Sequence, residues 1–287
     1  MKKPFGLSVL VLALSLFTGG TLTAKEAPPA FPKGEEVKVK AMSYNIHHGA
    51  GDDNVLDLKR VGDVLAASGA DIIGLQEVDN HWSSRSDFED EARWLADYLG
   101  MQYAFGANLD RDPLEEDGNR RQYGNAVLSR YPIIAQENHL LTSDPLEPRA
   151  EQRGMLEAVV NVKGNHVHFY STHLGLSVAE RTVQTGEVAR IVSERGGTAI
   201  VTGDFNAAPD TVEMENMAVF EDAFASSGDA YTFPVENPRI RADYIFFTGD
   251  MDWVSAEVIR TNASDHLPVT AEFLLKRTTP GASADSR

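Results

Sequence analysis

The chain contains no cysteine among its 287 residues. A framework of disulfides and lipid attachment through a cysteine are therefore both excluded. Basic residues are also scarce, because 26 Lys and Arg stand against 43 Asp and Glu, which gives a formal net charge of −17. This balance argues against broad electrostatic capture of nucleic acid, which depends on Lys and Arg contacts to phosphates. It does not exclude a nuclease, since a bound cation and a few arginines can contact phosphate.

The sequence also lacks a long apolar run. The apolar stretch from about Leu7 to Phe17 is shorter than the ~20 residues that a membrane-spanning helix needs. It follows Met1-Lys2-Lys3 and precedes small residues near Ala24, a pattern typical of a secretory signal peptide over residues 1–24. We therefore expect a secreted or periplasmic protein whose mature chain has no transmembrane segment.

The remaining chain shows no internal repeat and no linker that would split it. The prolines of residues 25–36 predict an extended leader, and the small polar residues of 278–287 predict a flexible tail. Residues 37–277 are expected to form a single catalytic domain and a monomer, a size that one α/β domain often reaches. Polar segments 111–119 and 142–149 are expected to be surface loops that shape a substrate groove.

Hydrophobic periodicity separates short strands from a few helices. Helical spacing appears in Leu58–Leu65, Phe88–Leu99 and Val188–Val192, and Gly69 and Gly100 stand where helices need C-terminal glycines. Strands outnumber helices and cluster late, which favours two packed sheets with helices outside. The expected strands, rich in Val, Ile, Phe and Tyr, are Val37–Asn45, Asp71–Gln76, Asn125–Ser129, Met155–Val162, His166–Thr172, Thr198–Thr202, Asp243–Phe247, Val254–Ile259 and Pro268–Phe273.

Five polar motifs stand at the boundaries of these strands. They supply hard oxygen ligands for a divalent cation and an imidazole that can act as a base. Hydrolysis of a phosphoester needs those parts, because the site must neutralise charge, deprotonate water and hold the reacting groups in line. The motifs are Ser43-Tyr44-Asn45, Leu75-Gln76-Glu77, Thr202-Gly203-Asp204-Phe205-Asn206, Ala242-Asp243-Tyr244 and Ser264-Asp265-His266.

The order of these motifs resembles that of the deoxyribonuclease-I-like endonuclease/exonuclease/phosphatase superfamily. The resemblance runs from Met42 to about Phe273, and it is specific because five ordered motifs coincide with strand ends. It implies an α/β (α+β) fold, a four-layer α-β-β-α sandwich of two mixed sheets. The active site is then expected at one edge, where loops from both sheets converge.

The resemblance also implies a metal site. Glu77 matches the family's main metal ligand, and Asn45 and Asp265 match residues near the metal or the substrate phosphate. Carboxylate and amide oxygens are the ligands that Mg²⁺ prefers. Mg²⁺ is the expected cofactor, with Mn²⁺ or Ca²⁺ as alternatives.

The same resemblance assigns the acid–base chemistry. His266 is expected to be the general base, and Asp243 to bind and orient its imidazole. Asp204 and Asn206 are expected to orient the attacking water and the phosphate. His173 is expected to donate a hydrogen bond to a phosphate oxygen.

Other polar residues carry weaker expectations. Asn125 either faces the substrate or serves packing. Arg153 either contacts a phosphate or is a solvated surface arginine. The adjacent His47 and His48 are typical of a solvent-facing turn.

The substrate class stays open. The continuation Ala207-Ala208-Pro209-Asp210 resembles exonuclease and deadenylase members, which favours a nuclease-like phosphodiesterase. A lipid-headgroup or glycolipid phosphodiesterase or phosphatase is the alternative, favoured by the acidic composition. A binding scaffold without catalysis is a distant third, because Glu77, Asp204, Asn206, Asp243 and His266 are all present.

Overall fold

The computed structural model describes residues 36–143, 150–249 and 251–276. The expected signal peptide and tail lie outside these residues, as do nearly all of the expected leader and most of the expected loop 142–149. Among the described residues, no helix is both long enough and apolar enough to cross a bilayer.

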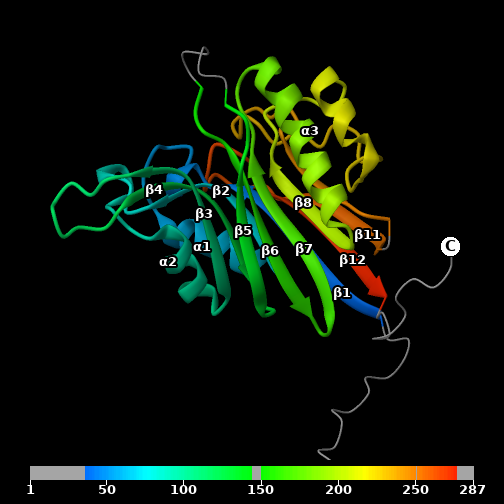
Figure 1. Cartoon of the computed structure of the whole chain (residues 1–287), viewed down its shortest axis with the longest axis horizontal. Helices are drawn as coiled ribbons and strands as arrows, with labels where there is room; N and C mark the ends of the chain where they lie inside the picture. The colour runs from blue at the N-terminus through cyan, green and yellow to red at the C-terminus, as the bar shows by residue number, and fades with distance from the viewer. Residues whose placement is uncertain (1–35, 144–149, 250, 277–287) are drawn as a thin grey trace, which may run out of the picture. The chain divides into compact units, whose positions relative to one another are not determined.

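Twelve strands form two six-stranded sheets (Figure 1). The strands are β1 Glu36–Asn45, β2 Ile72–Asn80, β3 Gln102–Arg111, β4 Arg121–Ser129, β5 Ile133–Leu140, β6 Gly154–Val162, β7 Asn165–His173, β8 Thr198–Asp204, β9 Glu221–Asp222, β10 Asp243–Phe247, β11 Met251–Val258 and β12 Val269–Lys276. The helices are α1 Leu58–Ser68, α2 Glu91–Leu99 and α3 Val178–Arg195, with 3₁₀ segments η1 His47–Gly49, η2 Ser84–Ser86 and η3 Val212–Val219.

Both sheets are mixed. The first has the strand order β11-β12-β1-β2-β4-β3 and the second β5-β6-β7-β8-β10-β9. The pairs β1–β2 and β7–β8 are parallel, whereas the other neighbours are antiparallel. Parallel neighbours end at the same edge of a sheet, so each sheet presents two adjacent carboxyl-terminal strand ends there.

Three apolar cores hold four layers together. The central core joins the inner faces of the two sheets, with Val39 from β1 and Phe169 from β7 both fully buried. A second core packs β1 and β2 against α1 and α2. A third packs β7, β8 and β10 against α3 and η3. The expected four-layer α-β-β-α sandwich is therefore confirmed.

Local sequence explains where the helices begin and end. Asp57 and Asp90 precede α1 and α2, and each side chain accepts a hydrogen bond from a free backbone N–H of the first turn. Gly69 and Gly100 end these helices in the left-handed region, at φ 66° and 65°. Both expected helix ends are confirmed, although Phe88 lies before α2.

Two longer strands, β3 and β5, are missing from the sequence expectation. Both are sheet edges with exposed positions, and β5 carries the polar run Ala135-Gln136-Glu137-Asn138. An edge strand needs few buried apolar residues, so its period-2 signal is weak. The expected end of the second strand at Gln76 is also wrong, because β2 continues to Asn80 through an irregularity between Leu75 and Val78.

Candidate active site

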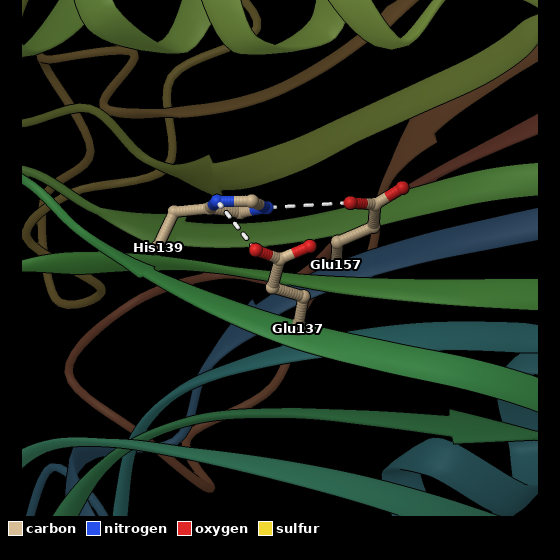
Figure 2. A group of neighbouring side chains, drawn as sticks. All are labelled: Glu137, His139 and Glu157. Atoms are coloured by element: carbon tan, nitrogen blue, oxygen red, sulfur yellow. Dashed lines mark hydrogen bonds and ion pairs between the residues drawn. The ribbon is translucent and has the colours of Figure 1, made fainter.

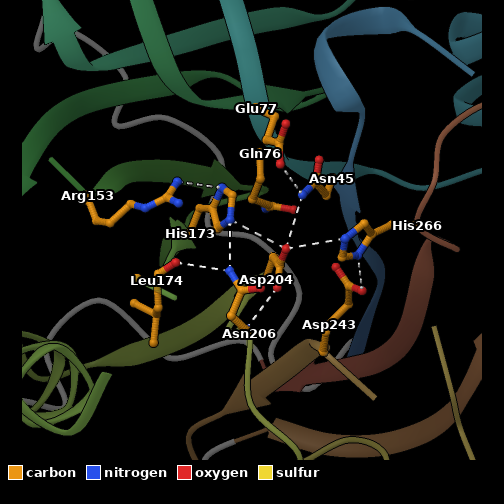
Figure 3. A network of polar contacts seen from close by, with 12 residues as sticks. Asn45, Gln76, Glu77, Arg153, His173, Leu174, Asp204, Asn206, Asp243 and His266 are labelled. Carbon is orange, nitrogen blue, oxygen red and sulfur yellow. Dashed lines mark hydrogen bonds and ion pairs between the residues drawn. The ribbon is translucent and has the colours of Figure 1, made fainter. Parts of the chain in front are cut away.

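Strand register brings the polar motifs to one edge of the sandwich. Asp204 at the end of β8 pairs with Asp243 of β10 on one side and with His173 of β7 on the other. In the other sheet, Asn45 at the end of β1 pairs with Gln76 of β2. Figure 3 shows these side chains pointing toward one another from both sheets.

Asp204 lies at the centre of this group. Its Oδ2 is 3.1 Å from Asn45 Nδ2, 3.5 Å from His173 Nε2 and 3.6 Å from His266 Nε2. The carboxylate is almost fully buried, and burial raises the pKa of Asp204 to about 6 against the opposing charge of His266. One carboxylate oxygen therefore joins the amide and both imidazoles.

His266 and Asp243 form a buried pair. His266 Nδ1 lies 2.9 Å from Asp243 Oδ2, which leaves Nε2 directed toward Asp204. Burial by itself lowers the pKa of His266, but the charges of Asp243 and Asp204 outweigh it and raise this pKa to about 10. The second oxygen of Asp243, Oδ1, is buried and has no hydrogen-bond partner. The two acids together thus carry more negative charge than one imidazolium offsets.

The loop that carries His266 is fastened to the first sheet. Ser264 Oγ donates to the backbone oxygen of Asn45 at 2.7 Å and accepts from the backbone N–H of His266 at 3.2 Å. Phe233 packs against the imidazole, with ring centroids 4.6 Å apart. The sequence pattern did not single out Phe233, because it lies outside any periodic segment.

His173 is held by Arg153. Arg153 Nη1 lies 3.2 Å from His173 Nδ1, and a guanidinium can only donate, so Nδ1 accepts and Nε2 carries the proton. Burial, followed by the charges of Arg153 and His266, holds the pKa of His173 well below its ordinary value. His173 is therefore a neutral donor whose Nε2–H faces Asp204.

Arg153 is not a solvated surface arginine. Its residue is only 6% exposed, and the guanidinium also pairs with Glu151 at 2.8 Å. The surface interpretation is wrong because the β6–β7 pairing sets Gly154 opposite His173 and draws the preceding Arg153 beneath the site. Its Nε is buried without a partner.

Glu77 lies inside β2 rather than after it. It occupies the irregularity between Leu75 and Val78 at φ 58°, a conformation that redirects the side chain. Asn45 Nδ2 donates to Glu77 Oε1 at 3.0 Å and so links Glu77 to Asp204. Asp265 is more open, with a side chain 36% exposed and an oxygen 4.0 Å from His47 Nδ1.

Gly203 and Phe205 set the path of the Asp204–Asn206 segment. A Cβ on Gly203 would come within 2.4 Å of the backbone oxygen of Thr172, so the strands approach closely only with glycine there. Phe205 points into the core and packs edge-on against Tyr244 and Phe246. Asn206 turns back at φ 51°, and its Nδ2 donates to the backbone oxygen of Leu174 at 3.1 Å.

The surroundings of Asn125 differ from those of the two adjacent histidines, His47 and His48. Asn125 is fully buried, and its Nδ2 donates to Gly154 O at 2.9 Å, a packing contact next to Arg153. His47 and His48 are half-buried rather than solvent-facing, and their buried Nδ1 atoms make no hydrogen bond within the described residues. The reason is η1, where three successive left-handed residues fold the histidines back toward Asn45 and Asp265.

A second cluster of similar composition, Glu137, His139 and Glu157, lies on β5 and β6 (Figure 2). Here Arg195 of α3 donates to both glutamates, at 2.6 Å and 2.7 Å. The carboxylate of Glu157 also lies 2.6 Å from His168 Nδ1 and 3.3 Å from His139 Nε2. Its negative charge is therefore already compensated, and the cluster ties α3 to the sheet.

The sandwich fold recurs in known proteins. The chain is 32% identical over 263 residues to YbhP, an uncharacterized protein of Escherichia coli strain K12, across 84% of this chain and 98% of YbhP. It superposes with a TM-score of 0.68 on an endonuclease/exonuclease/phosphatase from Beutenbergia cavernae, at 23% identity over 83% of this chain and 72% of the other.

A further structural neighbour is the mannosyl-6-phosphatase Bt3783 of Bacteroides thetaiotaomicron, with a TM-score of 0.66 and 18% identity over 82% of this chain and 99% of that one. At this identity the likeness shows the fold alone. The model of the Endonuclease/Exonuclease/phosphatase family matches residues 42–266, a span that contains every catalytic and metal residue expected from the sequence. The chain belongs to the Endonuclease/Exonuclease/phosphatase family.

Proposed function

We propose that this member of a phosphoesterase family is an exported phosphodiesterase that requires a divalent cation, Mg²⁺ foremost, and cleaves nucleic acid. The observation that carries the proposal is the meeting of three groups at Asp204 Oδ2: the Asn45 amide that also binds Glu77, the His173 imidazole held by Arg153, and the His266–Asp243 pair. Phosphoester hydrolysis needs a cation, a base and a donor at one place.

The residues fit a hard divalent cation. Glu77 and Asp265 offer carboxylate oxygens, which Mg²⁺ prefers. Asn45 donates its amide N–H to Glu77 and accepts from the His47 backbone, so it would bind the ion only after turning its amide oxygen toward Glu77. The buried acids also leave negative charge uncompensated, as the unpartnered Oδ1 of Asp243 indicates. When bound there, the cation would offset the charge of the phosphate and lower the pKa of a water molecule.

The protein's own groups supply the remaining chemistry. Asp243 holds Nδ1 of His266, so protons would enter and leave at Nε2, which faces the centre of the site. Asp204 and Asn206 would orient the attacking water. His173, kept neutral with its proton at Nε2, would donate to a non-bridging oxygen as negative charge develops.

Hydrolysis of bis(p-nitrophenyl) phosphate tests the proposal. We expect release of p-nitrophenol that depends on Mg²⁺, stops with EDTA and falls on the order of 10²–10⁴-fold in kcat in His266→Ala. His166→Ala is the matched control, because His166 is exposed at the start of β7. Absence of cation-dependent turnover on this ester and on natural phosphoesters would favour the scaffold.

A substrate panel assigns the natural ester. Plasmid DNA and single-stranded RNA test the nuclease, whereas sphingomyelin and phosphatidylinositol test the lipid-headgroup alternative, which the net charge of −17 favours. Export is tested separately by fractionation and by N-terminal sequencing of the purified protein, which should begin at Lys25. A full-length cytoplasmic product would contradict export and leave the chemistry unaffected.

A further inference from the structure

Two aromatic rings and two guanidinium groups form a cluster next to Glu77. Trp82 follows β2, Arg111 ends β3 and Tyr123 lies in β4. The Arg111 guanidinium lies 4.6 Å from the Trp82 ring centroid, and that of Arg85 lies 5.3 Å from the Tyr123 ring centroid. The two rings are 5.9 Å apart. We call these four residues the Trp82 cluster.

Arg85 is fixed in this cluster by a buried acid. Asp79 has no exposed surface, and its two oxygens accept from Arg85 Nε and Nη2 at 2.9 Å and 2.7 Å. The Arg85 side chain nevertheless remains 39% exposed. Its charge is thus positioned at the surface with little freedom to move away.

Arg111 has no acidic partner within the described part of the chain. Arg120, across the following turn, instead pairs with Asp110 at 2.6 Å and with Asp112 at 3.0 Å. A guanidinium stacked on an indole keeps its N–H groups directed outward in its own plane, where they can bind an anion. In a chain with so many acids, an exposed arginine held by an aromatic ring and left without a carboxylate is suited to an external anion.

The Trp82 cluster adjoins the proposed cation site. Tyr123 pairs with Asp79 in the β2–β4 register, two residues along the chain from Glu77. After burial, the charge of Glu77 makes the largest contribution to the raised pKa of Tyr123. An anion on Arg111 and Arg85 would therefore lie beside a phosphate that contacts the cation proposed at Glu77.

We propose that Trp82, Arg85 and Arg111 form a second anion subsite, which binds a phosphate of the substrate other than the one that is cleaved. This inference rests on the proposed function and deepens it. The ligand is a short single strand of nucleic acid, because the partly exposed Trp82 ring can stack on a base while the neighbouring arginines contact a phosphate. The Trp82 cluster offers two guanidinium groups, so we expect it to contact one phosphate next to the phosphate that is cleaved.

Inhibition by small nucleotides tests the second subsite. Thymidine 3′,5′-bisphosphate, thymidine 5′-monophosphate and thymidine 3′-monophosphate are compared against bis(p-nitrophenyl) phosphate hydrolysis at fixed free Mg²⁺. We expect the bisphosphate to have a Ki at least about tenfold below that of either monophosphate, the size of one charge-assisted hydrogen bond. Arg111→Gln should bring this ratio close to one, whereas the matched control Arg120→Gln should retain it.

Two results would overturn the second subsite: equal Ki values in the unmodified protein, or an unchanged ratio in Arg111→Gln. Inositol 1-phosphate and inositol 1,4-bisphosphate form a parallel pair, and an advantage for the bisphosphate in this pair alone would overturn the nucleic-acid assignment. Titration calorimetry of the same ligands with Mg²⁺ reports Kd without turnover. A protein that prefers the bisphosphate but hydrolyses no ester would refute the proposed function and leave the subsite standing.

Discussion

Two groups of histidine and carboxylate side chains in this fold differ in how their charge is balanced. In the Asp204–Asp243–His266 group, potential ligand atoms lie within 4.8 Å of one another, yet two buried acids share one imidazole. The Glu137–His139–Glu157 group is equally compact, but Arg195 donates to both of its glutamates.

The difference in charge balance distinguishes the Glu157 cluster from the proposed active site. Glu157 is surrounded by donors: burial raises its pKa, but hydrogen bonds from His168, Arg195 and His139 outweigh burial and keep the pKa below its ordinary value. Asp204 has no arginine at its carboxylate, and its pKa rises to about 6. A buried acid that lacks compensation costs stability, and such sites are characteristic of catalysis or cation binding.

The largest expected difference is in rate. Asp204→Asn keeps the side-chain volume but removes the charge at the centre of the site, so kcat should fall on the order of 10²–10⁴-fold. Glu157→Gln, the matched change in the other cluster, should leave kcat per folded molecule within about twofold. Steady-state kinetics on bis(p-nitrophenyl) phosphate measures both. Comparable losses in the two variants would abolish the distinction.

The loss of stability should be larger in Glu157→Gln than in Asp204→Asn, the opposite of the order expected for the rate. Glu157→Gln breaks a buried network and should lower the free energy of unfolding by about 3 kcal/mol, at the low end for a broken buried pair because Arg195 retains Glu137. Asp204→Asn should lower the free energy of unfolding by less, because it removes a buried charge that is poorly compensated. Urea unfolding at pH 7 with EDTA present measures both. A larger loss in Asp204→Asn would contradict the charge-balance account.

The effect of Glu157 on stability should depend on pH. Because the folded pKa of Glu157 is depressed, its stabilisation is fully present above the unfolded pKa of about 4.3 and is lost as pH falls through the lower folded value. The stability gap between the unmodified protein and Glu157→Gln should therefore narrow on acidification below about pH 4. A constant gap down to pH 3 would mean that the carboxylate charge is not what stabilises the cluster.

The Mg²⁺ concentration needed for half-maximal rate should also distinguish the two clusters, but by a smaller factor than kcat does. Glu77→Gln should raise the Mg²⁺ concentration for half-maximal rate at least about tenfold, because one of the proposed ligands loses its charge. Glu137→Gln should leave this concentration unchanged, since Arg195 already neutralises Glu137. Calorimetric titration with Mn²⁺ gives the same comparison without substrate. An unchanged metal titration in Glu77→Gln would remove Glu77 from the cation site.

The amino-acid sequence by itself determined most of the layers and the composition of the site. Period-2 apolar runs identified the central strands, and Gly69 and Gly100 identified the C-terminal ends of two helices, because these signals act over a few neighbouring residues. The ordered motifs identify Asn45, Glu77, Asp204 and His266 as candidate site residues. The edge strands β3 and β5 were not predicted, because exposure weakens their apolar pattern.

Tertiary structure alone decided which polar residues share a partner. A surface position for Arg153 was compatible with the sequence. The β6–β7 register instead places its guanidinium next to His173. The His47-His48 pair is turned inward by a left-handed turn, and Arg111 lies over the Trp82 ring. Whether a buried acid is compensated depends on contacts between residues as distant along the chain as Glu157 and Arg195. Such contacts arise from packing and strand register, which no local pattern of residues encodes.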